Sequence, residues 1–169
     1  IRHSSFVIRH SPISHLRKMT RTEAYLALNL IPNIGPVRLR RLVEHFGSPE
    51  AALRAKSTQI AAINGFEQKL ADHVADWENQ IDLAGELRKI DDRGLTLLTQ
   101  EDELYPDLLR QALGAPFLLY VWGNLTKRDH NAIGVVGSRQ ATHYGLAAAK
   151  KLSFQIAYAG YTVVSGLAR

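Results

Sequence analysis

Hydrophobic residues in the first half of the sequence recur three and four positions apart, the spacing that places them on one face of an α-helix. The segment 37–46 shows this spacing in a stripe of Leu39, Leu42, Val43 and Phe46. Gly47 follows as a residue suited to the left-handed end of a helix. Ser48 and Pro49 are typical of the N-cap and the first position of a further helix. The pattern predicts a helix over 37–46 and a short helix after it.

Further helices are predicted on both sides of this segment. Thr20 or Thr22 can cap an earlier helix that ends before Pro32. Downstream, hydrophobic residues alternate in steps of four and three over 70–87. This spacing predicts one long helix, with Gly94 as its C-terminal cap.

The second half of the sequence changes to short β-prone runs. Two of these, 95–99 and 117–121, are bounded by turn residues. The pattern then predicts a strand over 131–136, a helix over 143–159 and a strand over 161–164. A strand, a helix and a strand in this order form a β-α-β unit, whose two strands pair in parallel.

Two loops between predicted helices have the form of a helical hairpin. Residues 30–36 read Leu-Ile-Pro-Asn-Ile-Gly-Pro, and 63–66 are a shorter match. A glycine there lets backbone approach a phosphate, and the N–H groups of the next helix are anion donors. The alternative is that Gly35 only joins two helices, and the second loop, with Glu67 beside Lys69, is better interpreted as a turn. The residues that could contact a nucleic-acid backbone are Gly35, Arg38 and Arg41, and we add Lys150 of the predicted helix over 143–159 as a further secondary contact.

Composition indicates a cytoplasmic protein. The 169 residues are 46% hydrophobic, which is enough for a core, and contain no cysteine, which excludes disulfides and thiolate metal sites. No stretch approaches the roughly 18 apolar residues of a membrane-spanning helix. We therefore expect no membrane association. Histidines and carboxylates could still hold a metal ion, but we expect neither a bound metal nor a cofactor.

The sequence pI of about 9.6 depends largely on residues 1–18. Without that segment the chain has 17 basic and 16 acidic residues. The segment repeats Ile-Arg-His-Ser after seven residues and precedes the only methionine, Met19. We interpret 1–18 as a non-native or disordered extension, translated from upstream of a start at Met19. The alternative is a basic arm that binds nucleic acid.

A glycine-rich turn follows the predicted strand at 131–136. Gly137, Ser138 and Arg139 stand between that strand and a helix that Thr142 can cap. Phosphate sites of α/β proteins lie at this position, where a helix N-terminus adds donors. The sequence after Asp129 contains no acidic residue. The alternative is a tight turn with a solvated arginine.

Familiar nucleotide motifs are missing from this turn. It lacks the later glycines and the acid of a dinucleotide site, and no Gly-Lys-Ser/Thr follows it, which excludes a P-loop. Tyr144 and Gly145 next to the cap favour a ligand, because the tyrosine can stack on a base and glycine permits close approach. His143 has no identifiable partner, and we expect it on the helix surface.

The order of these motifs resembles the DNA-processing protein A family, also called Smf, from Met19 onward. The resemblance is carried by the hairpin loops, Tyr-Pro at 105–106, the run 116–123, and above all Val-Gly-Ser-Arg-Gln-Ala-Thr-His-Tyr-Gly at 136–145 with Val-Ser-Gly-Leu-Ala at 164–168. It implies a non-enzymatic protein that binds and protects single-stranded DNA, loads the RecA recombinase in natural transformation, and forms a homodimer. It also implies a pocket for DNA phosphates lined by Gly137, Ser138, Arg139, Thr142, Tyr144, Gly145, Ser165 and Gly166.

The expected fold class is α+β. A small all-α helix-hairpin-helix or SAM-like domain over 19–93 precedes the first part of a Rossmann-like parallel sheet over 94–169. The family continues beyond the second turn, so the resemblance implies a truncated sheet. A rival hypothesis is a nucleotide- or phospho-ligand-binding enzyme of a related Rossmann-like family, such as a nucleotide hydrolase, which would need a positioned carboxylate.

Overall fold

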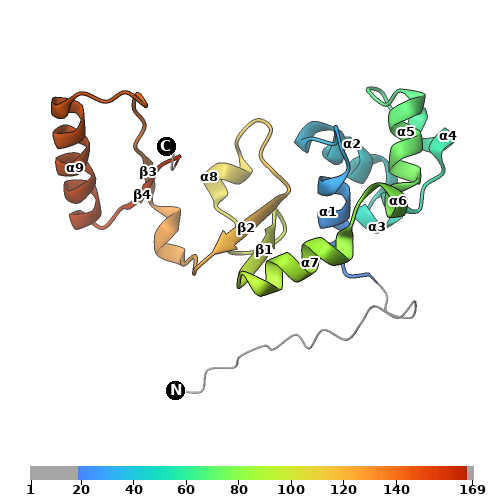
Figure 1. Cartoon of the computed structure of the whole chain (residues 1–169), viewed down its shortest axis with the longest axis horizontal. Coiled ribbons are helices and arrows are strands. Elements are labelled where there is room, and N and C mark those ends of the chain that lie inside the picture. The colour runs from blue at the N-terminus through green and yellow to red at the C-terminus, as the bar shows by residue number, and fades with distance from the viewer. Residues whose placement is uncertain (1–18, 167–169) are drawn as a thin grey trace, which may run out of the picture.

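A computed structural model describes residues 19–166 (Figure 1). Residues 1–18, for which we expect a non-native or disordered extension, lie outside the described residues, as do 167–169. The helical part contains α1 (Arg21–Leu30), α2 (Pro36–Phe46), α3 (Pro49–Leu53), α4 (Ser57–Ala61), α5 (Gln68–Ala75), α6 (Trp77–Gln80) and α7 (Leu83–Asp92). The remainder contains β1 (Leu95–Thr99), α8 (Asp107–Arg110), β2 (Leu118–Trp122), the 3-10 helix η1 (Lys127–His130), β3 (Ala132–Gly134), α9 (His143–Tyr158) and β4 (Thr162–Val164). The fold class is α+β, as predicted.

The capping residues predicted from the sequence lie at the ends of the first helices. Thr20 accepts a hydrogen bond from the N–H of Glu23, whose carboxylate in turn accepts one from Thr20 N–H. Gly47 ends α2 with φ of 80°, the left-handed conformation that favours glycine. Ser48 accepts a hydrogen bond from the N–H of Ala51 at the start of α3. These local rules fix the helix boundaries.

The prediction of one long helix over 70–87 is wrong, because the structure has three helices there, α5, α6 and α7. Asp76 leaves the helical conformation with φ of −101° and ψ of 26°, and Ile81 is extended. The carboxylate of Asp82 then accepts a hydrogen bond from the N–H of Gly85, 2.8 Å away, and caps α7. Aspartate side chains compete with the helix for backbone donors, so hydrophobic spacing can continue across a break.

One hydrophobic core joins the helices to the first two strands. Tyr25, Leu28 and Leu42 are fully or almost fully buried in it, and Leu118 of β2 belongs to the same cluster. The strands β1 and β2 pair antiparallel, with Leu95 opposite Trp122. The expected domain boundary at residue 94 stays a prediction, but the hydrophobic packing continues across it.

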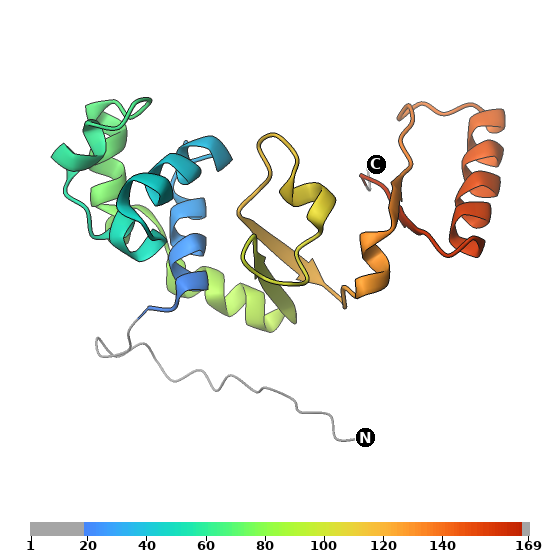
Figure 2. The ribbon, with the colours of Figure 1, turned by 180° about the vertical axis from the view of Figure 1, so that it is seen from behind.

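The β-α-β unit lies at the opposite end of the molecule from α2 to α5 (Figures 1 and 2). The strands β3 and β4 pair in parallel with Gly134 opposite Val164, as predicted, although β3 is shorter than the expected 131–136. Asp129 ties η1 to β4 through a hydrogen bond from the hydroxyl of Thr162, at 2.8 Å. No residue of α9 is buried. No helix within residues 19–166 has the length and apolar character to cross a membrane.

Candidate nucleic-acid interface

The glycine-rich turn follows β3 at the edge of the sheet where β4 also ends. Because Gly134 pairs with Val164 in parallel, the residues after both strands leave the sheet on the same side. A hydrogen bond from the N–H of Val135 to the carbonyl of Val164, 2.8 Å long, extends this pairing. Ser165 and Gly166 therefore follow β4 at the same edge of the sheet at which the turn follows β3.

Local hydrogen bonds shape the turn and the start of α9. The hydroxyl of Ser138 accepts a hydrogen bond from the N–H of Gln140 at 3.2 Å, and the hydroxyl of Thr142 accepts one from the N–H of Gly145 at 3.1 Å. Thr142 is thus the predicted N-cap of α9. A hydroxyl that caps a helix is occupied, so its contribution to a ligand site is to position the N-terminus.

Arg139 is exposed and has no hydrogen bond or ion pair within residues 19–166. A side chain at Gly137 would meet nothing within 4 Å in the described chain, so packing there does not require glycine. An open backbone beside a free guanidinium and a helix N-terminus can receive an anion. Tyr144 is 83% exposed and stands in the first turn of α9.

Asp129 is the acidic residue nearest to this edge in the sequence, and it is engaged elsewhere. It accepts hydrogen bonds from the N–H of Thr126 at 2.7 Å and from the hydroxyl of Thr162 at 2.8 Å. The backbone bond from Thr126, followed by the Thr162 hydroxyl, lowers the pKa of Asp129. A carboxylate held in its ionised form by structural donors is poorly suited to general acid catalysis. Residues 19–166 contain no group of three or more side chains arranged to hold a metal ion.

Three of the four secondary residues do not join this site. Gly35, Arg38 and Arg41 belong to the loop before α2 and to α2 itself, at the far end of the molecule from α9 (Figure 1). Lys150 lies two turns into α9 and is exposed. In the described chain Gly35, Arg38 and Arg41 therefore form a separate surface, whereas Lys150 shares α9 with Tyr144 and Gly145.

The arginines of α2 fasten the two hairpin loops to each other. Arg38 donates to the carbonyls of Asn33 at 2.9 Å and Gly65 at 3.2 Å. Arg41 donates to the carbonyl of Asn64 at 2.8 Å. These bonds join the loops before α2 and α5, and they occupy guanidinium donors that we expected to contact DNA. DNA contact by either arginine stays a prediction.

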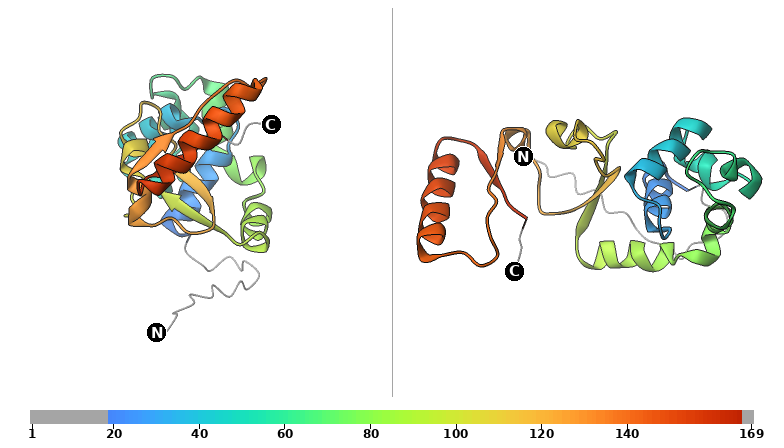
Figure 3. Two further views of the ribbon diagram at one scale, coloured as in Figure 1. Left: turned by 90° about the vertical axis from the view of Figure 1, so that its left-hand side faces the viewer. Right: turned by 90° about the horizontal axis from the view of Figure 1, so that it is seen from above.

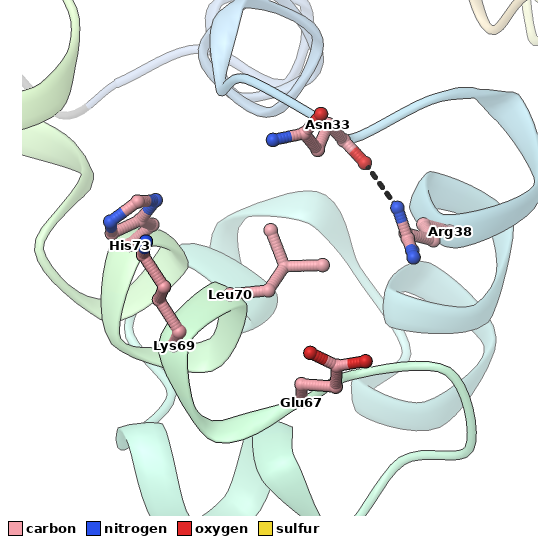
Figure 4. Close-up of a pocket in the computed structure, with 6 residues that line it drawn as sticks. All are labelled: Asn33, Arg38, Glu67, Lys69, Leu70 and His73. Carbon is pink, nitrogen blue, oxygen red and sulfur yellow. Dashed lines mark hydrogen bonds between the residues drawn. The ribbon is translucent and has the colours of Figure 1, made fainter.

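A pocket of about 320 Å³ lies beside these bonds, between the first loop and α5. Figure 4 shows Asn33 and Arg38 on one side of it and Lys69 and His73 on the other, with Glu67 below. Asn33 adopts a left-handed conformation with φ of 67°. The sequence did not indicate this pocket, since only the i, i+4 spacing of Lys69 and His73 hints at a shared face.

Two family models match the chain. Residues 96–169 match the family described as DNA recombination-mediator protein A, and residues 25–76 match the SAM-like helix-hairpin-helix tandem. The second match agrees with the two loops that Arg38 and Arg41 join. The predicted hairpin module and the predicted family are both supported.

Curated relatives point the same way. Protein Smf of Synechocystis sp. is 31% identical over 148 residues, which cover 85% of this chain and 37% of the relative. The DNA processing protein DprA of Bacillus subtilis is 31% identical over 78 residues, covering 46% of this chain and 26% of the relative. The UvrABC system protein C of Cereibacter sphaeroides is 31% identical over 64 residues, which cover 38% of this chain and 10% of the relative. The chain spans little more than a third of the length of the Smf relative.

Proposed function

Because this chain belongs to the DNA recombination-mediator protein A family, we propose that it binds and protects single-stranded DNA and delivers it to the RecA recombinase. The observation that carries the DNA-binding proposal is the guanidinium of Arg139, which has no partner within residues 19–166, beside the open turn at Gly137. Both stand where β3 and β4 end together. Phosphate groups match this chemistry, because backbone N–H groups and arginine donate to them without reading base edges.

The first set of contacts in this proposal consists of residues at the sheet edge. Arg139 pairs with a phosphate, the backbone at Gly137 and Gly166 gives close access, and Tyr144 stacks on a base. Thr142 and Gly145 hold the start of α9 in place through their hydrogen bond. Ser138 and Ser165 supply hydroxyls to the same edge. The set is Gly137, Ser138, Arg139, Thr142, Tyr144, Gly145, Ser165 and Gly166.

We further propose that the protein acts without catalysis. The carboxylate that a hydrolase would need is not offered by Asp129, whose oxygens accept bonds from Thr126 and Thr162. RecA loading and homodimer formation rest on the family membership, and both belong to the proposal. Gly35, Arg38, Arg41 and Lys150 are proposed as secondary contacts, with the two arginines acting mainly through the loops that they join.

A competition experiment tests the proposal. The protein is bound to a fluorescent single strand of mixed sequence, and unlabelled single strand or duplex of equal length is added. We expect the single strand to displace the probe at much lower concentration, with little dependence on sequence. Equal displacement by duplex would overturn the choice of ligand.

Two further measurements test the other parts of the proposal. Release of phosphate or nucleoside from a nucleotide panel would overturn the non-enzymatic assignment. RecA assembly on single strands, followed with and without the protein, tests the proposed delivery.

A further inference from the structure

The helix α9 carries a second aromatic surface beyond the glycine turn. Tyr144, Lys151, Phe154 and Tyr158 follow one another at spacings of seven, three and four residues, which places them on one face of the helix. We call these four residues the α9 stripe. Tyr144 belongs to the motif at 136–145, whereas Phe154 and Tyr158 lie outside it.

The stripe faces away from the strands. Gly145, Ser153 and Ile156 lie on the opposite side of α9 and are partly covered, where the helix packs along β4 (Figure 3). In contrast, Tyr144, Phe154 and Tyr158 are 83%, 71% and 86% exposed. In an α/β layer a helix buries the side that faces the sheet, so further strands beside β3 and β4 would cover that side and leave the stripe open.

Two of the three rings of the stripe lie nearly parallel. Phe154 and Tyr158 stack with centroids 6.3 Å apart and an interplanar angle of 16°. Large exposed aromatic groups in a row indicate a binding surface, because burying each ring in a complex is favourable. The remaining question is which class of partner the stripe fits.

Charge selects the partner. The helix sequence contains Lys150 and Lys151 and no acidic residue, and Arg139 lies in the turn before it. Alternating cations and flat rings suit a polymer that alternates phosphates with exposed base faces, which is single-stranded nucleic acid. A duplex hides its base faces in the stack, and the rings would have nothing to stack on.

We propose that a single strand bound at the glycine turn continues along α9, with bases stacked on Tyr144, Phe154 and Tyr158 and phosphates beside Lys150 and Lys151. Fourteen residues separate the first and last ring, which corresponds to about 21 Å along the helix axis. The strand therefore gains contacts only when it is long enough to leave the turn. This inference rests on the proposed binding of single-stranded DNA, and it adds a second contact region to it.

The test compares oligo-dT strands of increasing length, from about 4 to about 16 nucleotides, the range of site sizes of single-strand-binding folds. The full chain is prepared as wild type, as the Phe154→Leu, Tyr158→Leu double variant, and as the Phe154→Tyr, Tyr158→Phe double variant. The leucines keep an apolar side chain but remove the rings, whereas the exchanged aromatics keep both rings. Circular dichroism melts establish that all three fold alike.

We expect the leucine variant to bind the longest strands at least about tenfold more weakly than wild type, since stacking on an aromatic side chain is worth about fivefold or more per base and the variant loses two rings. On the shortest strands it should equal wild type, and the exchanged variant should equal wild type at every length. Photocrosslinking of 5-bromodeoxyuridine strands should label Phe154 and Tyr158 only with long strands.

The outcomes separate this inference from the proposed function. If the wild type does not bind single strands at any length, the proposed function is wrong and the inference fails with it. If wild type binds but the leucine variant keeps full affinity for long strands, the proposed binding at the glycine turn is retained, and the stripe does not bind DNA. A leucine variant with unchanged DNA affinity and an altered mass in light scattering would identify the stripe as a contact between copies, which also overturns the inference.

Discussion

Arg21, the first residue of α1, holds the carboxylate of Glu101 with two hydrogen bonds, Nε to Oε2 at 2.6 Å and Nη2 to Oε1 at 2.7 Å. The hydroxyl of Tyr25 donates a third bond to Oε1 at 2.8 Å. The Arg21 bonds hold the pKa of Glu101 below its usual range. Burial, followed by the bond to Glu101, raises the pKa of Tyr25 to about 12. This cluster fastens the loop after β1 to the helical module.

Glu101→Gln should therefore lower the stability at neutral pH by about 1 kcal/mol, because a partly exposed ion pair is screened by solvent. A lowered pKa in the folded state adds stability above the ordinary value of 4.5, and that stability is lost as the pH falls below it. The variant should lose less stability than wild type between about pH 5 and pH 3. Urea melts across this range measure the difference.

Glu103→Gln is the matched control, since Glu103 lies in the same loop and, within residues 19–166, its exposed carboxylate pairs only with the exposed Lys127. It should leave both the stability and its pH dependence close to wild type. An equal effect of the two substitutions would mean that the Arg21 cluster contributes no more to stability than an exposed ion pair.

Arg41→Ala should destabilise the helical module by about 1 kcal/mol, because it removes the charged donor that holds the carbonyl of Asn64. The exposed position reduces the effect below that of a buried charged bond. The control is Arg54→Ala, whose side chain has no hydrogen bond or ion pair within residues 19–166. A normal melt together with weakened DNA binding would show instead that Arg41 contacts DNA directly.

Thr142→Ala should lower stability by about 1 kcal/mol, the usual effect of losing an N-cap oxygen. The bond to the N–H of Gly145 disappears, and the first turn of α9 frays beside the glycine turn. Thr142→Ser keeps the hydroxyl and should behave as wild type. Hydrogen exchange of the amides of residues 143–146 distinguishes the variants, and equal protection in both would contradict the capping role.

Local rules explain which parts of the fold were predictable from the sequence. Thr20, Gly47, Ser48 and Thr142 cap or end helices through contacts within a few residues, and all four were identified. The parallel pairing of β3 and β4 follows from the order of strand, helix and strand.

The features that the sequence did not predict depend on tertiary contacts or on local hydrogen bonds that compete with the helix. Asp82 caps α7 inside a hydrophobic pattern that continues unbroken, so spacing alone missed the interruption. The bonds of Arg38 and Arg41 reach loops that are distant in the sequence, and no motif indicates them. At the candidate site, the sequence indicated the residues of the turn. Only the structure shows which side of α9 faces the strands.

Arg139 provides the sharpest test of the DNA site. Its guanidinium is exposed and lacks a partner within the described residues, at the edge where β3 and β4 end. Arg139→Ala should weaken binding to single strands of every length by about 1.5 to 3 kcal/mol, the range for a charged hydrogen bond. The dependence of affinity on salt should fall by about 0.7 in log-log slope, for one lost phosphate contact on a single strand.

Stability should barely change in this variant, because an arginine without an ion-pair partner contributes little to folding. Arg128→Ala is the matched control, since Arg128 is exposed in η1 and its side chain has no hydrogen bond or ion pair in the part of the chain that the structure describes. It tests whether the loss of any positive charge weakens binding through the general field of the protein. Binding isotherms at several salt concentrations and one denaturant melt per variant are sufficient. If Arg139→Ala and Arg128→Ala weaken binding equally, Arg139 contributes to DNA binding only through the overall positive charge of the protein. If neither does, the hairpin surface around Lys69 and His73 becomes the better candidate for the phosphate site.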